Sequence, residues 1–185
     1  MPYGVMLYFD DQTEKRIIKV WQALAENNLS SNILDAGIRP HITLAIYEYL
    51  DCQPCENELV KITTKTTSLP IQFTHLGIFT NPEPVVFAAP LVSKELLDFH
   101  KNLQDILTSE GKNPWELYNP GKWVPHCTLS LGFKIENLTE IFRICQAMPF
   151  PMDVSAIQLG VVNFRPVRDL FNYDFLSLKG EKTDL

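Results

Sequence analysis

The stretches Pro40-His41-Ile42-Thr43-Leu44 and Pro125-His126-Cys127-Thr128-Leu129 carry proline, histidine, threonine and leucine at the same four positions. The chain has 185 residues and four histidines, so half of its histidines stand in this one pattern. A single His-x-Thr carries little information, whereas two copies with matching flanks indicate a common role. The chain therefore offers two imidazoles and two hydroxyl groups that are suited to act together.

Both stretches have the composition of a β-strand, in which alternate side chains point to the same face. His41 and Thr43 should share one face of the first strand, and His126 and Thr128 one face of the second. The residues between them are apolar and should point into the core. Proline is tolerated at the first position of a strand, where the missing N–H costs little. Each copy is thus predicted to form a strand with a His-Thr pair on one face and apolar residues packed into the core on the other.

The order of predicted elements repeats along the chain, and such repeats are informative about the fold. Alternating or continuous apolar residues predict strands, and apolar residues at helical spacing predict helices. The first half is expected to hold a strand, a helix, the first His-Thr strand, a helix and a strand, at Tyr3–Phe9, Asp11–Asn27, His41–Tyr47, Glu56–Thr66 and Ile71–Phe79.

The second half is expected to hold the same elements in the same order. Ser93 is suited to cap its first helix. Two loops, Leu29–Ile38 and Gly111–Gly121, should precede the two His-Thr strands. The remaining predicted elements are strands at Val85–Ala89 and Met152–Asn163, a helix at Leu138–Ala147 and a last strand at Phe171–Leu178.

This repeated unit of strand, helix, His-x-Thr strand, helix and strand resembles the 2H phosphoesterase superfamily, which includes 2′-5′ RNA ligase-like and cyclic phosphodiesterase proteins. The resemblance covers about residues 1–178. It implies an α+β, internally duplicated, two-lobed fold in which antiparallel sheets form a central groove and the helices lie outside. We expect one domain over 1–178, made of pseudo-repeats at about 1–80 and 84–178, and a mobile tail over 179–185.

The resemblance also implies the activity. We expect a metal-independent phosphoesterase that acts on 2′,3′-cyclic phosphate or 2′-5′ phosphodiester bonds of nucleotides or RNA ends. His41 and His126 would be the catalytic acid and base, and Thr43 and Thr128 would bind the phosphate. Imidazole suits both proton-transfer roles because its ordinary pKa lies near neutrality. The near-symmetry of the two motifs leaves open which histidine is the acid. No metal and no cofactor are expected.

Four further residues are candidates for binding the substrate. Arg39 and Arg165 are cations near the motifs or near the end of the repeat. Tyr118 and Trp123 crowd the segment that leads into the second motif, where aromatic rings can stack on a base. Each has a plainer alternative: the arginines are solvated surface charges, and the aromatic residues close off the adjoining core.

Three other interpretations of the motifs stay open. The chain can be a non-catalytic module that binds nucleotides or RNA ends, or it can have an RNA 2′-5′ ligase-type activity. A metal site is disfavoured because no Cys, His, Asp or Glu stands at a familiar ligand spacing beside the histidines.

The Cys52-x-x-Cys55 pair is expected in a loop, as two incidental thiols.

The net charge of −6 argues against binding of long nucleic acid, because proteins that bind it usually have a basic face. A small nucleotide or one RNA terminus needs only a few local donors. No apolar stretch is long enough to span a membrane, and the N-terminus lacks the features of a signal peptide. We therefore expect a cytoplasmic protein, and a monomer is the simplest expectation.

Overall fold

An antiparallel sheet organises the computed structural model, which describes residues 1–164 and 166–176. The strands lie in the order β5-β2-β1-β7-β3-β4-β6, and β8 pairs with β7. Every pairing is antiparallel in this described part of the chain. The strands are β1 (Tyr3–Phe9), β2 (His41–Leu50), β3 (Leu69–Phe79), β4 (Val85–Pro90), β5 (Gly111–Pro114), β6 (Cys127–Leu131), β7 (Met152–Asn163) and β8 (Arg168–Asp174).

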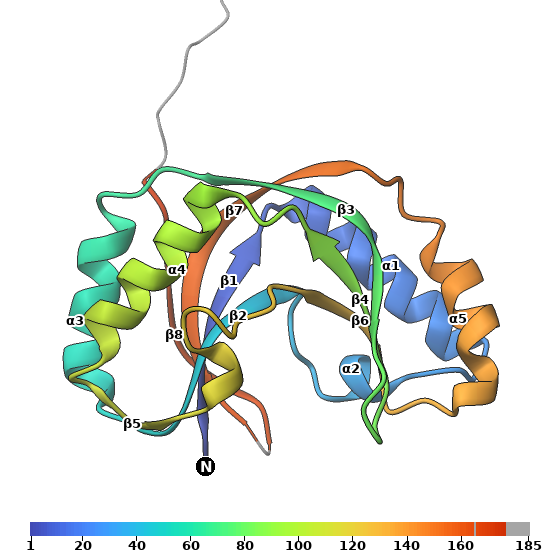
Figure 1. Ribbon diagram of the computed structural model, residues 1–185, viewed down its shortest axis with the longest axis horizontal. Helices are drawn as coiled ribbons and strands as arrows, with labels where there is room; N and C mark the ends of the chain where they lie inside the picture. The colour runs from blue at the N-terminus through green and yellow to red at the C-terminus, as the bar shows by residue number, and fades with distance from the viewer. Residues whose placement is uncertain (165, 177–185) are drawn as a thin grey trace, which may run out of the picture.

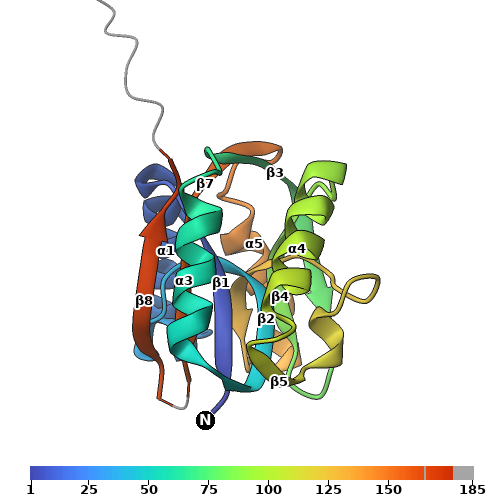
Figure 2. The ribbon, with the colours of Figure 1, turned by 90° about the vertical axis from the view of Figure 1, so that its left-hand side faces the viewer.

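The longer helices flank the sheet in two pairs (Figure 1). Helices α1 (Asp11–Glu26) and α5 (Leu138–Cys145) pack together on one flank, while α3 (Cys52–Thr63) and α4 (Lys94–Leu107) pack together on the other. Figure 2 shows α3 and α4 side by side in front of the strands. The short segments are α2 (Asn32–Asp35), η1 (Glu116–Tyr118) and η2 (Ile135–Asn137).

Strand pairing follows one scheme at both ends of the sheet. β1 lies between β2 and β7, while β4 lies between β6 and β3, and β7 pairs with β3 at the centre. The two His-Thr segments therefore lie on β2 and β6, far apart in strand order. The sheet is strongly curved, and β2 and β6 contact each other (Figure 1).

Two tryptophans tie β2 and β6 to opposite halves of the chain. The Trp123 indole N–H, which precedes β6, donates to the backbone oxygen of Thr43 on β2 at 2.9 Å. The Trp21 indole N–H, on α1, donates to the backbone oxygen of Thr128 on β6 at 3.2 Å. Both indoles are buried, with 3% and 8% of Trp21 and Trp123 exposed. Each bond ties one motif strand to a segment from the other half of the chain.

Helix α4 supports β2 through a buried polar pair. The Nε2 atoms of His100 and Gln104 each lie about 3 Å from the backbone oxygens of Leu44 and Tyr118. The His100 ring also stacks on Trp123, with ring centroids 3.9 Å apart. His100 therefore has a structural role.

The structure corrects the prediction that Cys52 and Cys55 lie in a loop, because α3 begins at Cys52 rather than near Glu56. Pro54 stands in the first turn of this helix. A proline in the first helical turn is harmless, since its missing N–H has no partner inside the helix there. Both thiols are free, and burial raises the pKa of each.

The two predicted loops also contain short elements. Residues 29–38 include α2, and residues 111–121 include β5 and η1. β5 pairs with β2 and extends the sheet, and Gly111 lies opposite Leu50. A Cβ at position 111 would collide with the Tyr47 ring, so the strands can approach this closely only with glycine there. A glycine in such a segment suggested a loop, although here it permits close strand packing.

The C-terminal strand begins three residues earlier than predicted, at Arg168, and pairs with β7 as a hairpin. The end of the predicted strand and the predicted tail, 177–185, lie outside the described residues. Among the described residues, no helix is long and apolar enough to cross a membrane.

The helix caps provide a test of the fold. Asp10 caps α1 and accepts hydrogen bonds from Thr13 N, Thr13 Oγ1 and Ser155 N, whereas Ser93 caps α4 and accepts one from Leu96 N. We expect Asp10→Ala to lower the free energy of unfolding by about 2 kcal/mol and Ser93→Ala by about 1 kcal/mol. Urea denaturation measures both values, and a larger loss for Ser93→Ala would contradict this account.

Candidate active site

The four motif side chains lie as the strand alternation predicts. His41 and Thr43 are half-buried on β2, and Thr128 is half-buried on β6. His126 is half-buried and directly precedes β6. The residues that alternate with them are almost completely buried: Ile42, Leu44, Cys127 and Leu129. Each motif thus presents its polar pair away from the core that anchors it.

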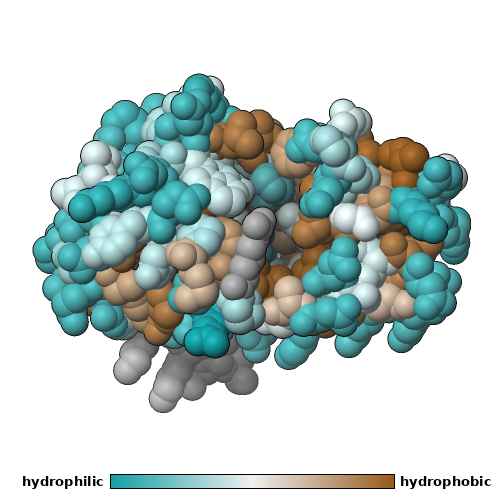
Figure 3. All heavy atoms as spheres, turned by 90° about the horizontal axis from the view of Figure 1, so that it is seen from below, coloured by the Kyte–Doolittle hydropathy of each residue, from teal (hydrophilic) through white to brown (hydrophobic). Residues whose placement is uncertain are grey.

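A cavity of about 530 Å³ brings three of these side chains together: His41, Thr43 and Thr128. A hollow between the two flanks is visible in Figure 3, with hydrophobic residues inside it. His126 stands close enough for its charge to act on His41, where it lowers the pKa of the His41 ring. The His126 ring packs against Phe79 and Phe87, with centroids 4.9 and 5.4 Å away.

Backbone carbonyls fix the tautomer of both histidines. His41 Nδ1 lies 2.6 Å from Arg39 O, and His126 Nδ1 lies 2.8 Å from Val124 O. A carbonyl oxygen only accepts hydrogen bonds, so each Nδ1 must carry the proton. In the neutral ring, the Nε2 atom is then left with its lone pair. Both rings therefore have the same nitrogen available to accept or donate a proton.

Burial separates the proton affinities of the two rings. Desolvation lowers the pKa of His41 to about 4; the hydrogen bond to Arg39 O opposes this shift and the charge of His126 adds to it. Desolvation also lowers the pKa of His126, but by less. When one proton is shared by the pair, it therefore resides mainly on His126. His41 is left neutral and able to accept a proton.

The threonine hydroxyls face the same cavity. Among the described residues, Thr43 Oγ1 donates only to the sulfur of Met6, at 3.5 Å. Sulfur is a weak acceptor, so an anion in the cavity would readily replace it. Thr128 lines the cavity and is the counterpart of Thr43 in the sequence repeat. These hydroxyls can donate to phosphoryl oxygens.

The other predicted site residues have different positions. Tyr118 lines the cavity. Arg39 pairs with Glu14 at 2.7 Å, donates to Gln158 and lies over the Tyr8 ring, so its charge is already engaged. Trp123 is not among the cavity-lining residues, because its ring is stacked on His100 in the core. Arg165 lies outside the described residues.

Sequence reasoning missed most of the cavity wall. Its apolar part comes from β1, α1, α2, β2, β6 and the segment after β7, and includes Trp21, Ile33, Ile46, Leu131 and Phe164. Its polar part includes Asn32 and Asp35 on α2. For α2, the sequence signal was its place in the segment that precedes the first motif.

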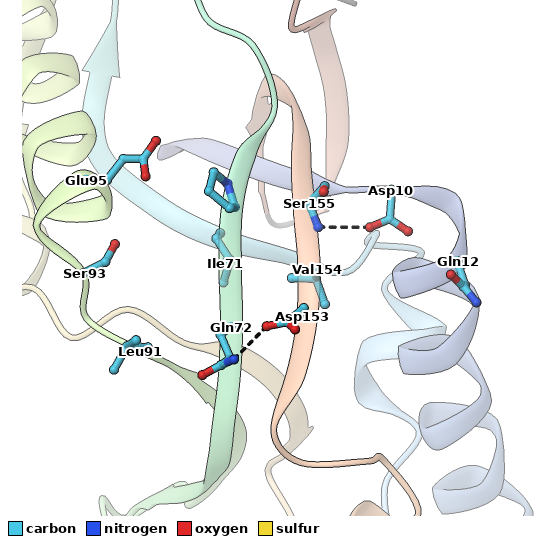
Figure 4. Close-up of a pocket in the computed structure, with 11 residues that line it drawn as sticks. Asp10, Gln12, Ile71, Gln72, Leu91, Ser93, Glu95, Asp153, Val154 and Ser155 are labelled. Carbon is cyan, nitrogen blue, oxygen red and sulfur yellow. Dashed lines mark hydrogen bonds between the residues drawn. The ribbon is translucent and has the colours of Figure 1, made fainter. Parts of the chain in front are cut away.

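A second hollow, of about 580 Å³, lies over the beginnings of β3 and β7, between the beginnings of α1 and α4 (Figure 4). Its polar groups are largely engaged: Asp10 accepts from Ser155 N, and Asp153 accepts from Gln72. It is not lined by histidine. The chemistry of the motifs therefore belongs to the first cavity.

No group of three or more His, Cys, Asp and Glu side chains suited to hold a metal ion occurs within residues 1–164 and 166–176. The site is better described as a pair of imidazoles and a pair of hydroxyls in an apolar cavity. Such a set can exchange protons and bind a phosphate oxygen.

Comparison with known proteins agrees with this arrangement. A model of the 2′-5′ RNA ligase superfamily matches residues 9–163. Among curated proteins no match was found. Three similar structures are LigT of E. coli with 3′-AMP, TT0787 of Thermus thermophilus and Usb1 of Kluyveromyces marxianus with uridine monophosphate.

These structures share the fold at low sequence identity. LigT has a TM-score of 0.59 at 13% identity, with 96% of this chain and 100% of LigT covered. TT0787 has a TM-score of 0.60 at 14%, with 95% and 98% covered. Usb1 has a TM-score of 0.51 at 10%, with 91% and 96% covered. The α+β fold with an antiparallel sheet is therefore that of LigT.

The histidine assignments can be checked by NMR. At neutral pH, we expect the ¹⁵N shifts of His41 and His126 to show a protonated Nδ1 and an unprotonated Nε2. On acidification, His126 should take up its proton first, and His41 should titrate near pH 4. His126→Gln removes the positive charge that lowers the His41 pKa, so the midpoint of His41 should rise.

The exposed His75 on β3 provides the control, because His75→Gln should leave the His41 midpoint unchanged. If His41 takes up its proton before His126, the assignment of proton affinities is wrong.

Proposed function

Because the chain belongs to the 2′-5′ RNA ligase superfamily, we propose that it is a metal-independent phosphoesterase. Its substrates would be nucleotides or RNA ends with a 2′,3′-cyclic phosphate or a 2′-5′ phosphodiester bond. The observation that carries this proposal is the approach of two matched His-Thr pairs to one cavity.

We further infer that the fold arose by internal duplication. Strand order supports this: exchanging β1, β2 and β3 with β4, β6 and β7 leaves the pairings among these six strands unchanged, while β5 and β8 are additions to the scheme. The two halves, about 1–80 and 84–178, would then form one domain with a central groove. Each half supplies one His-Thr strand and one of the tryptophans that hold the strands together.

In the proposed mechanism, His41 is the base and His126 the acid. His41 Nε2 removes a proton from water, and the water oxygen attacks phosphorus. As the bond between phosphorus and the leaving oxygen breaks, His126 Nε2–H gives its proton to that oxygen. The order of proton affinities supports this assignment, because the shared proton resides mainly on His126.

Thr43 and Thr128 would donate hydrogen bonds to the non-bridging phosphoryl oxygens. Donors placed in a site with little water stabilise the charge on these oxygens in the transition state. Their neutral hydroxyls fit a cavity whose described lining is mostly apolar. Tyr118 is the remaining candidate for contact with a base, since it lines the cavity.

A nucleotide or an RNA terminus suits the size of the site. A volume of about 530 Å³ lies within the range of small-molecule sites and is too small for a folded nucleic acid. The LigT and Usb1 structures with 3′-AMP and uridine monophosphate support a nucleotide ligand. We do not expect long nucleic acid as a partner, and a monomer is sufficient to form the site.

Turnover assays would separate the alternatives. The panel contains 2′,3′-cyclic mononucleotides, ADP-ribose cyclic phosphate, 2′-5′ oligoadenylates and RNA with a cyclic end. Release of a phosphomonoester supports the phosphoesterase. Binding without product supports a nucleotide-binding module, and joined RNA supports the ligase-type reaction.

Single substitutions test the roles of the motif residues. We expect His41→Ala and His126→Ala each to lower kcat roughly 100- to 10,000-fold, as for a lost proton-transfer group. Thr43→Ala and Thr128→Ala should cost roughly 10- to 1000-fold, as for a lost hydrogen-bond donor. Initial rates on a 2′,3′-cyclic nucleotide measure these effects.

Thr74 and His75 are a natural control, since Thr74 Oγ1 lies 2.9 Å from His75 Nδ1 outside the cavity. Alanine at either position should leave kcat unchanged. A His126→Ala variant with full activity would remove His126 from the mechanism.

The pH dependence follows from the two pKa shifts. The base must be neutral, so kcat/KM should rise through pH 4, the approximate pKa of His41. The acid must be protonated, so kcat/KM should fall above the pKa of His126, which burial holds below its ordinary value of 6.5. The bell-shaped profile should therefore have its optimum on the acidic side of 6.5.

The same rates should be unchanged in EDTA. Activity that is lost in EDTA and restored by one divalent ion would refute the metal-independent mechanism.

A further inference from the structure

The short helix α2 forms one wall of the cavity and is tied to the second His-Thr strand. Ser30 Oγ and Asn32 Nδ2 both donate to Leu131 O, at 3.3 and 3.0 Å. Gly132 has a φ of 66°, and a Cβ there would lie 2.7 Å from Asn32 Nδ2. Glycine at this position therefore leaves room for the contact, and α2 is held as a fixed wall.

Asp35 gives this wall its charge. It lines the cavity from the exposed side of α2, and Ser31 Oγ donates to its Oδ2 at 2.7 Å, which orients the carboxylate. Among the described lining residues, Asp35 alone has a formal charge at neutral pH, because burial lowers the pKa of His41. The fixed charge on the described part of the cavity wall is thus negative.

A carboxylate at this position acts differently on the two parts of a nucleotide. A phosphate held by the His-Thr pairs leaves the rest of the molecule to extend along the cavity wall. There Asp35 can accept hydrogen bonds from N–H or O–H groups of the base or ribose. A second phosphate on the same molecule would be repelled by the carboxylate, because like charges at the rim of the cavity repel each other even where water weakens the interaction.

We propose that Asp35 is a specificity-determining residue that restricts the cavity to nucleotides with one phosphate group. This inference rests on the proposed function and narrows its substrate class to phosphoesters whose 5′ end is a free hydroxyl. Nucleotides that also carry a 5′-phosphate are then poor ligands, and so are RNA 3′ ends, because their terminal nucleotide carries a 5′-phosphodiester.

Calorimetry with two probes tests the inference. Adenosine 3′-monophosphate and adenosine 3′,5′-bisphosphate differ by one phosphate group. The unchanged protein should bind the monophosphate about tenfold more tightly than the bisphosphate, the size expected for one like-charge repulsion. Asp35→Asn should bring this ratio close to one, and Asp35→Glu should keep it.

Glu95 supplies the matched control. It is an exposed carboxylate on α4 that lines the second hollow (Figure 4), so Glu95→Gln changes the net charge equally but leaves the cavity intact. The ratio of the two affinities should not change in this variant.

The outcomes separate this inference from the proposed function. A bisphosphate that binds as tightly as the monophosphate, or a ratio that Asp35→Asn leaves unchanged, overturns the inference even if cyclic phosphates are hydrolysed. Failure of both probes to bind overturns it too. The expected ratio without turnover of any cyclic phosphate supports the role of Asp35 and rejects the phosphoesterase.

Discussion

The site depends on a reciprocal pair of tryptophan hydrogen bonds. Trp123 binds the backbone of Thr43 on β2, and Trp21 binds the backbone of Thr128 on β6. β2 and β6 are far apart in strand order, so sheet pairing alone would not bring them together. Because both indoles are buried, each bond is protected from water, and loss of either partner leaves a buried polar group unpaired.

Burial also lowers the pKa values of the two histidines. An apolar surrounding makes the charged imidazole costly, so both pKa values fall, and the fall is larger for His41. The carbonyls of Arg39 and Val124 hold each ring in one tautomer. Two nearly identical motifs thus acquire different proton affinities, and the proposed division into base and acid follows from that difference.

The proposed phosphate ligand is compatible with a chain whose net charge is −6. In the proposed mechanism, two hydroxyls, a neutral His41 and a protonated His126 would meet the phosphate, while Arg39 is engaged by Glu14. Affinity would then come from short-range hydrogen bonds and apolar contact rather than from a basic surface. The proposed role of Asp35 extends this logic, since a carboxylate beside a cation-poor site discriminates against additional phosphate.

The sequence by itself determined the motif strands, their alternation, most of the helices and the family, because these depend on local periodicity and on residue types at short spacing. It misplaced the start of α3, and it left open whether Trp123 contacts the substrate or closes off the core. The residue types alone do not reveal whether a proline lies in a loop or in a first helical turn, or whether an aromatic ring is exposed or buried. Only the tertiary structure decided which histidine is more deeply desolvated, that Arg39 is paired and that α2 forms a wall. Those properties arise from contacts between residues far apart in the chain, which no local pattern encodes.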